Sequence, residues 1–362
     1  MGVQVKRQAK VLVNLQIARF FAAFSVAMVH VRDEVPKGKL PGFEQFDPML
    51  WFPWGFGVDV FFVLSGFVMV FTSDRLTGGK RDAAQFFKRR FERVTPLYWL
   101  FTLLMLLSMV ATGAASQIAS YHVLASLFYL PIPAPGGEIN PILSIGWTIN
   151  YEMFFYALFS LTLLLPINQS RKALFGALIA LVAVGQLVPN LPQPLFFWTR
   201  PILLEFLVGC ALALVYQKGV RLSRGVSYGL VSVGFALLFV ASSQGIAEGQ
   251  LHRWWALGIP ATLIMAGLAL SRQLEDRGIA KGLHYLGNAG YSLYLVHPFM
   301  IVAVAMVWSK FGIPSLAGFV VMALVAAVVG SILVFKYIED PIVQFLKVRP
   351  HAFARGKVAV AN

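Results

Sequence analysis

The sequence predicts an all-α integral membrane protein, a bundle of about ten transmembrane helices with both termini in the cytoplasm. Of its 362 residues, 58% are hydrophobic and only 13% are charged, which is typical of a chain that folds in a bilayer. Apolar runs of about 20 residues, long enough to cross a membrane, recur along the chain. Basic residues gather in the connections between these runs, mainly in alternate ones.

The predicted spans follow one another through mostly short connections. An additional apolar run at 118–131 is too short to cross and ends in a stretch rich in proline and glycine, so we expect an interfacial or re-entrant piece there. The ten predicted spans are residues 11–31, 55–73, 94–112, 142–165, 172–189, 199–217, 225–243, 253–271, 288–309 and 314–337.

The lysines and arginines predict the orientation. With the N-terminus in the cytoplasm, the cytoplasmic segments hold 23 of the 30 Lys and Arg, the opposite side holds 6, and Arg19 lies within the membrane. This asymmetry follows the positive-inside rule. The formal net charge of +14 therefore does not indicate a nucleic-acid partner, because the basic residues are spread over connections between spans.

We expect one membrane domain over residues 1–347, followed by a basic cytoplasmic tail at 348–362. No connection is long enough for a soluble domain. The single cysteine, Cys210, lies in an apolar run, where a packed, inert thiol is expected; it excludes an internal disulfide. The histidines show no metal-ligand spacing, so we expect no metal site.

Two polar residues stand out in the first span, Arg19 and His30. They are 11 residues apart, close to three helical turns, so they share one face and lie roughly 16 Å apart along the axis. Charged groups inside a membrane are costly and usually face a protein interior, which makes this pair a functional candidate. The structural alternative for His30 is a histidine whose hydrogen bonds are merely satisfied at an interface.

Two acidic residues are candidate partners for this pair. Asp59 is at a depth similar to that of His30, and a histidine–carboxylate pair there would suit a general base acting on a hydroxyl. Glu152 is expected roughly 15 Å into its span, where a carboxylate needs a partner, and Arg19 is the candidate. The alternative for Glu152 is a purely structural ion pair.

Two further groups are expected to be structural. Glu205 is predicted to pack or to pair with Arg200. His297 precedes Pro298 within a span, where the proline frees a backbone carbonyl and kinks the helix.

The cytoplasmic segment 82–93 resembles an interfacial amphipathic helix, in which phenylalanines share one face and Arg89, Arg90 and Arg93 form a basic cluster. Guanidinium groups suit bidentate phosphate recognition. Charge alone favours the alternative, which is contact with anionic lipid headgroups. Thr95-Pro96 is expected to open the third span, because proline is tolerated at a helix start.

Several motifs, in order along the chain, resemble the membrane acyltransferase 3 family. The segment 146–156 is similar to the variant found in its exopolysaccharide-acyltransferase (ExoZ-like) branch. The other motifs are Arg19 with His30 after ten intervening residues, the segment 57–67, Arg90-Phe91-Glu92-Arg93 with Pro96 and Tyr98, the segment 291–298, and Glu339-Asp340-Pro341.

The resemblance implies transfer of an acyl group, usually acetyl, from cytoplasmic acyl-CoA to a sugar hydroxyl at or outside a bacterial cytoplasmic membrane. By this resemblance His30 is catalytic, Arg19 lines the active site, and Arg90 and Arg93 hold the donor's phosphates. We add Asp59 and Glu152 to the candidate catalytic set. We add Arg89 and Ser65 to the candidate donor site, in which acetyl-CoA is the expected donor and no metal takes part.

The mechanism expected from these residues requires a channel, because His30 is up to roughly 28 Å from Val11 in a straight helix. Ser65-Gly66 would permit close approach along it. His30 either deprotonates the acceptor hydroxyl or takes the acyl group itself. The expected partners are acyl-CoA, a carbohydrate acceptor and membrane lipid. Alternatives are a transporter or flippase for a glycan or small metabolite and a non-catalytic scaffold in polysaccharide assembly.

Overall fold

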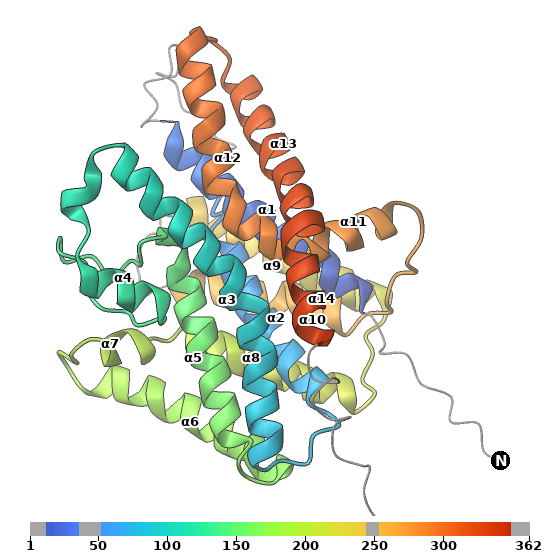
Figure 1. Ribbon diagram of the computed structural model, residues 1–362. Coiled ribbons are helices and arrows are strands. Elements are labelled where there is room, and N and C mark those ends of the chain that lie inside the picture. The colour runs from blue at the N-terminus through green and yellow to red at the C-terminus, as the bar shows by residue number, and fades with distance from the viewer. Residues whose placement is uncertain (1–11, 36–51, 244–252, 349–362) are drawn as a thin grey trace, which may run out of the picture.

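A computed structural model describes residues 12–35, 52–243 and 253–348, and its architecture over these residues is helical, with no β-strand (Figure 1). The tail predicted at 348–362 lies almost entirely outside them. The longer elements, in chain order, are α1 (Val13–Glu34), α2 (Phe56–Thr72), α3 (Lys80–Ala111), α4 (Ser120–Leu127), α5 (Trp147–Thr162), α6 (Ile167–Leu187), α8 (Leu203–Gln217), α9 (Arg224–Ser243), α10 (Ile259–Ala269), α11 (Gly278–Asn288), α12 (Gly290–Phe311), α13 (Leu316–Val334) and α14 (Asp340–Val348). The shorter elements are η2 (Ala114–Gln117), η3 (Ser144–Gly146), α7 (Leu195–Trp198), and the π-helical turns η5 (Trp254–Gly258) and η6 (Phe335–Glu339).

Seven helical segments of the described chain are long and apolar enough to cross a membrane. Two further apolar segments, α2 and the continuous η5–α10, are shorter. Each of the ten predicted spans contains a helix: the seven long segments and the two shorter ones account for nine spans, and α5 lies in the tenth. The prediction of an all-helical, multi-pass membrane fold is therefore confirmed, whereas the count of ten crossings and the sides of the two termini remain predictions.

The centre of the bundle is built by α2 lying against α8. A Cβ atom added at Gly66 would lie 2.0 Å from the carbonyl oxygen of Phe206, and one at Gly209 would lie 2.0 Å from that of Val63. Glycine at both positions lets the two backbones touch, as small residues do between membrane helices. Around this contact Phe67 and Phe206 are fully buried. This is a contact between helices, and the close approach expected along a channel at Ser65-Gly66 stays a prediction.

The third span differs from the prediction. The amphipathic segment and the span form one 32-residue helix, α3, which continues through Pro96 instead of starting there. Proline leaves one backbone carbonyl of the helix without its usual N–H donor, and membrane helices tolerate this where neighbouring groups supply hydrogen bonds. The carbonyl that Pro96 leaves without its N–H donor is that of Glu92, four residues earlier. Close to the proline, the Tyr291 hydroxyl donates to the carbonyl of Val94 at 2.8 Å and the Tyr129 hydroxyl donates to Thr95 Oγ1 at 2.8 Å, which ties this part of α3 to its neighbours.

The short apolar run at 118–131 contains α4, which has eight residues and cannot span a bilayer. Its end is fixed to the bundle through Ser126. The carbonyl of Ser126 accepts a hydrogen bond from the Tyr98 hydroxyl at 3.1 Å, and its Oγ accepts one from the backbone N–H of Ile142 at 2.9 Å. The prediction of a non-spanning piece is confirmed.

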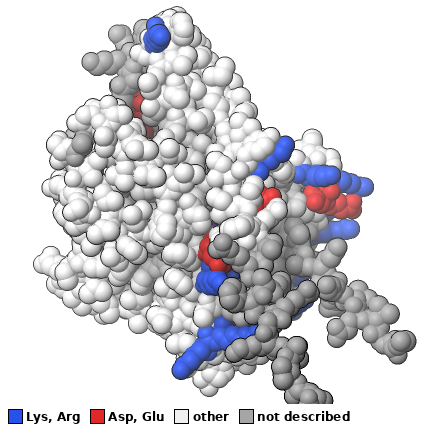
Figure 2. Space-filling model, viewed as in Figure 1, with Lys and Arg blue, Asp and Glu red and all other residues white. Residues whose placement is uncertain are grey.

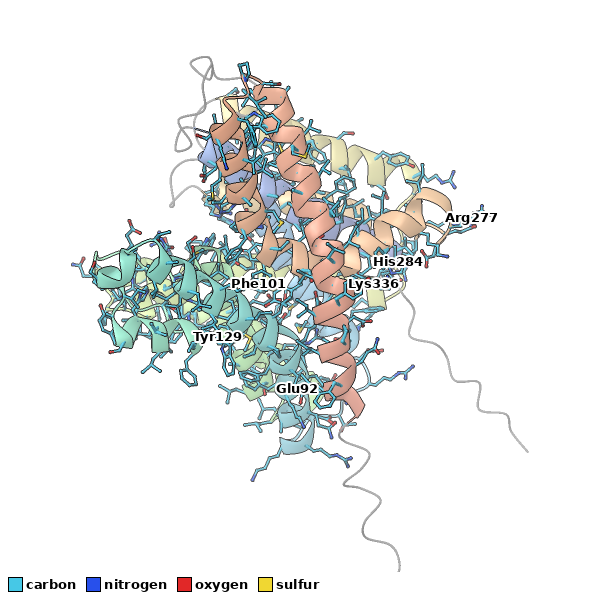
Figure 3. All side chains as sticks on the ribbon, turned by 45° about the horizontal axis from the view of Figure 1, so that its top comes forward. Glu92, Phe101, Tyr129, Arg277, His284 and Lys336 are labelled. Carbon is cyan, nitrogen blue, oxygen red and sulfur yellow. The ribbon has the colours of Figure 1, made fainter. Side chains whose placement is uncertain are left out.

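Charged side chains gather toward one end of the molecule. In the view of Figure 2, Lys and Arg cluster at the lower right, near the ends of α3, α11 and α14 in Figure 1, and most of the remaining face is uncharged. Figure 3 shows Arg277 just before α11 and His284 on it, with Lys336 just beyond α13 and Glu92 on α3. An uncharged surface of this kind suits lipid contact.

Candidate active site

A narrow cavity of about 90 Å³ runs beside α2 and is lined by residues of α1, α2, α3, α5 and α12. Its α2 lining extends from Val58 to Met69, which is about 16 Å along the helix. Arg90 and Arg93 of α3 also line it, as do Thr148 of α5 and Tyr294 of α12. An elongated cavity within the bundle is what the sequence-based mechanism requires.

Three arginines, Arg19, Arg90 and Arg93, line this cavity with a single carboxylate, Glu152. The guanidinium of Arg90 donates to Thr72 Oγ1 at 3.1 Å and lies 5.7 Å from the ring centre of Phe86. These contacts hold it at the end of α2. Three cations against one anion make the cavity suited to an anionic ligand.

Arg89 lies outside this cavity. Its side chain is exposed, and its guanidinium donates to Gln85 Oε1 at 3.4 Å. Of the four residues expected at the donor site, Arg90, Arg93 and Ser65 therefore line the cavity, and Arg89 does not.

Glu152 is held by hydroxyl groups. It accepts hydrogen bonds from Ser65 Oγ at 3.3 Å and from the Tyr156 hydroxyl, one helical turn further along α5. The direct ion pair predicted with Arg19 is not formed, because the Arg19 guanidinium donates to Gln16 Oε1 at 2.6 Å. Both charged groups still line the same cavity. Sequence reasoning missed Tyr156, although its i+4 spacing from Glu152 was a usable signal.

His30 is in contact with His297. His30 Nδ1 lies 3.0 Å from the carbonyl oxygen of Val26 and 3.3 Å from Nε2 of His297, and His297 Nδ1 lies 3.1 Å from the carbonyl oxygen of Leu293. A carbonyl only accepts, so we assign the proton of each neutral ring to Nδ1. His297 Nε2 can then accept from His30 Nδ1–H, and the lone pair of His30 is on Nε2.

Arg19 and His30 both face α12, as their spacing predicts. A Cβ atom at Gly290 would lie 3.0 Å from Arg19 Cγ, and His297 lies further along α12 beside His30. The two helices therefore run parallel. The ring centres of His297 and Tyr294 are 6.0 Å apart, and Tyr294 lines the cavity. His30 itself does not line the cavity; it is linked to the cavity wall through His297, which lies beside Tyr294.

Asp59 has a different partner from the one predicted. Its Oδ2 accepts from Arg253 Nη2 at 2.7 Å, and the carboxylate is fully buried. Glu205 is buried next to this pair, while Arg200 lies over the ring of Phe196. The predicted His30–Asp59 pair is therefore wrong. A desolvated carboxylate is stabilised far more by a guanidinium than by a neutral imidazole. Of the two alternatives for Glu205, packing is confirmed, and the pair with Arg200 is not formed.

Two other expectations concern cysteine and metal. Cys210 is fully buried, as predicted for a packed thiol, and its Sγ lies 3.5 Å from the carbonyl oxygen of Gly66. Within the described ranges, His, Cys, Asp and Glu side chains form no group that could hold a metal ion.

The fold and the cavity are those of a membrane-embedded enzyme, and the chain belongs to the family described as "Acyltransferase domain", which it matches over residues 12–336. It is an acyltransferase, as the motif resemblance predicted.

Three relatives illustrate the family. The exopolysaccharide production protein ExoZ of Rhizobium meliloti (strain 1021) is 34% identical, with 80% of this chain and 89% of ExoZ aligned. The acyltransferase MdmB of Streptomyces mycarofaciens is 27% identical, over 82% of this chain and 83% of MdmB. The O-acetyltransferase OatA of Staphylococcus aureus (strain NCTC 8325 / PS 47) is 25% identical, over 81% of this chain and 53% of OatA. No solved structure matches the chain significantly.

Proposed function

We propose that this acyltransferase moves an acetyl or similar acyl group from cytoplasmic acyl-CoA to a hydroxyl of a carbohydrate, such as an exopolysaccharide or its lipid-linked precursor. The observation that carries this proposal is the elongated cavity beside α2, which is lined by three arginines and by Tyr294, the neighbour of the His30–His297 pair. The names of ExoZ, an exopolysaccharide production protein, and OatA, an O-acetyltransferase, support the acceptor class and the reaction.

The donor would bind with its phosphates at the arginines. Coenzyme A carries several phosphate charges, and Arg90 and Arg93 offer bidentate donors in the cavity. The narrow pantetheine arm would then lie along α2, past Ser65 and Arg19, with the thioester toward Tyr294. At about 90 Å³ the cavity is smaller than a typical small-molecule site, so its walls would have to move apart to admit this arm.

His30 would perform the proton transfer. In the direct route, its Nε2 takes the proton of the acceptor hydroxyl, the hydroxyl oxygen attacks the thioester carbonyl, the C–S bond breaks, and the proton passes to the departing thiolate. In the alternative route, Nε2 attacks the thioester carbonyl, the C–S bond breaks and the thiolate leaves; the acceptor oxygen then attacks the acyl carbon, the N–C bond breaks, and the hydroxyl proton passes to the thiolate. In both routes His297 accepts from His30 Nδ1–H and supports the positive charge that develops on the ring.

The two acidic candidates would have different roles. Glu152 remains in the proposed site, where it balances part of the arginine charge and orients Ser65 and Tyr156. Asp59 would act at a distance from the chemistry by holding Arg253.

We place the protein in the bacterial cytoplasmic membrane. Both termini, and the end of the molecule where Lys and Arg cluster, would face the cytoplasm. The bacterial sources of the relatives and the distribution of Lys and Arg support this.

The function is tested by reconstituting the purified protein in lipid vesicles with acetyl-CoA that carries a labelled acetyl group and with a set of bacterial exopolysaccharides. We expect label on the glycan, and none when His30 is replaced by alanine. Glycan uptake into the vesicles without label transfer would instead support the transporter or flippase alternative. If neither label transfer nor glycan uptake is observed, the result would support the alternative of a non-catalytic scaffold.

A further inference from the structure

A second cavity, of about 500 Å³, lies against a different face of α5. It is lined by Trp147 and Tyr151, which are one turn apart, whereas Thr148 and Glu152 line the first cavity. Successive helical residues point about 100° apart, so the two cavities lie against neighbouring faces of the first turns of α5.

The wall of this second cavity presents flat aromatic surfaces. Trp147, Tyr151, Phe196 and Trp254 all line it. Tyr151 is fixed in place, since its ring stacks on Phe197 with centres 4.0 Å apart and its hydroxyl donates to the Phe197 carbonyl at 2.8 Å. The C–H face of a sugar ring is apolar and packs on such surfaces, while the hydroxyls at its edge need polar partners. A cavity of this size is typical of small-molecule sites.

Two arginines line the same cavity, Arg200 and Arg253. Arg253 is anchored by Asp59 and by the carbonyl of Gly55, both through Nη2. Arg200 lies 4.7 Å from the ring centre of Phe196 and forms no ion pair with any of the residues that the structure describes. The carboxylate lining this cavity is that of the exposed Glu138. Because Arg253 is already paired with Asp59, Arg200 is the guanidinium that can bind a carboxylate or phosphate of a ligand.

We propose that this second cavity binds an acidic sugar unit of the acceptor glycan, held by Arg200 and stacked on the aromatic wall. The proposal rests on the proposed function, because it gives the acceptor a negative charge. Because the two cavities lie against neighbouring faces of α5, one unit of a glycan can occupy this cavity while another presents its hydroxyl toward His30.

The test is a binding experiment that needs no catalysis. The full chain carrying His30→Ala is placed in phosphatidylcholine nanodiscs and titrated, by calorimetry, with an oligosaccharide that contains glucuronate and with its carboxyl-reduced counterpart. We expect preference for the acidic form. Arg200→Gln should weaken binding of that form by about tenfold or more and leave the reduced form unchanged, because a charge-assisted hydrogen bond is lost. The matched control is Arg224→Gln, an exposed arginine at the start of α9.

The outcomes separate this proposal from the enzymatic one. Equal affinity for the two oligosaccharides, or no effect of Arg200→Gln on the acidic form, would overturn the acidic-sugar site even if the wild type transfers acyl groups. Arg200-dependent binding without acyl transfer by the wild type would support the site and contradict the proposed function. Loss of oligosaccharide binding when phosphatidylglycerol is added to the nanodiscs would assign the cavity to lipid headgroups and overturn the proposal.

Discussion

His30 Nδ1 lies 3.3 Å from His297 Nε2, although the two histidines are 267 residues apart in the chain. The carbonyl oxygens of Val26 and Leu293 give both rings the same tautomer. This makes His297 the acceptor for His30, the position that a carboxylate fills in many catalytic pairs. His297 is also fully buried, so the contact is shielded from solvent.

The first prediction concerns this contact. Replacing His297 by phenylalanine removes the acceptor, and we expect kcat of acyl transfer to fall about a hundredfold with little change in KM for the donor. His297→Gln can accept from His30 and should restore part of the rate. The measurement is steady-state transfer from labelled acetyl-CoA. Equal losses in both variants, accompanied by lower thermal stability, would make His297 a packing residue only.

The second prediction concerns His30 itself. His30→Ala should abolish transfer while the protein still inserts in the membrane, because the ring is only half-buried and alanine favours helix. Membrane fractionation and labelled transfer on the same preparation check this. Activity that survives in the correctly inserted variant would remove His30 from the mechanism.

The third prediction concerns the donor. Arg90→Ala combined with Arg93→Ala should raise KM for acetyl-CoA by about tenfold or more, since each arginine can make charge-assisted bonds to phosphate. Arg89→Ala should have a smaller effect, because Arg89 is exposed outside the cavity.

The control for the donor variants is Arg277→Ala, a surface arginine on the loop before α11. An unchanged donor KM in the double variant would support the alternative that Arg90 and Arg93 contact lipid headgroups instead of the donor.

The fourth prediction tests the new partner of Asp59. Asp59→Asn leaves Arg253 without its buried counterion and should destabilise the protein by about 3–5 kcal/mol. Asp59→Asn with Arg253→Gln should cost less than the sum of the two single changes, as thermal or denaturant unfolding of the reconstituted protein would measure. Strict additivity would argue against the pair.

The fifth prediction concerns the α2–α8 contact. Gly66→Ala or Gly209→Ala would force a methyl group against backbone oxygen, with an expected cost of about 1–3 kcal/mol or more in stability. Gly176→Ala in α6 is the matched control, because nothing lies within 4 Å of its added Cβ, and helix propensity favours alanine there. Equal thermal stability of Gly66→Ala and Gly176→Ala would contradict the packing.

The helices could be predicted from the sequence because apolar length is a local property, and so could the shared face of Arg19 and His30, since a helix fixes the direction of residues 11 apart. The predicted partners failed at His30–Asp59, Arg19–Glu152 and Glu205–Arg200. Each of these depends on which helices pack together and on which polar groups compete for each charge. Asp59 and Arg253 are 194 residues apart, so no spacing rule connects them.

Pro96 shows a second limit of sequence reasoning. A proline normally marks a helix start, and that rule fails in α3, which continues through Pro96. The hydroxyl groups of Tyr129 and Tyr291, which bond to Thr95 and Val94 beside the proline, come from distant parts of the chain and cannot be seen in the local sequence.

The hydroxyl of Tyr294 bonds to the carbonyl of Ile145 at 2.8 Å and lies 2.5 Å from Thr148 Oγ1, so it ties α12 to the start of α5 at one end of the first cavity. In the proposed reaction the acyl group passes through the bilayer, and this must happen without opening a pore for ions. We expect the hydrogen-bonded tyrosine to close this end of the cavity, which would let a living cell keep its proton gradient between turnovers.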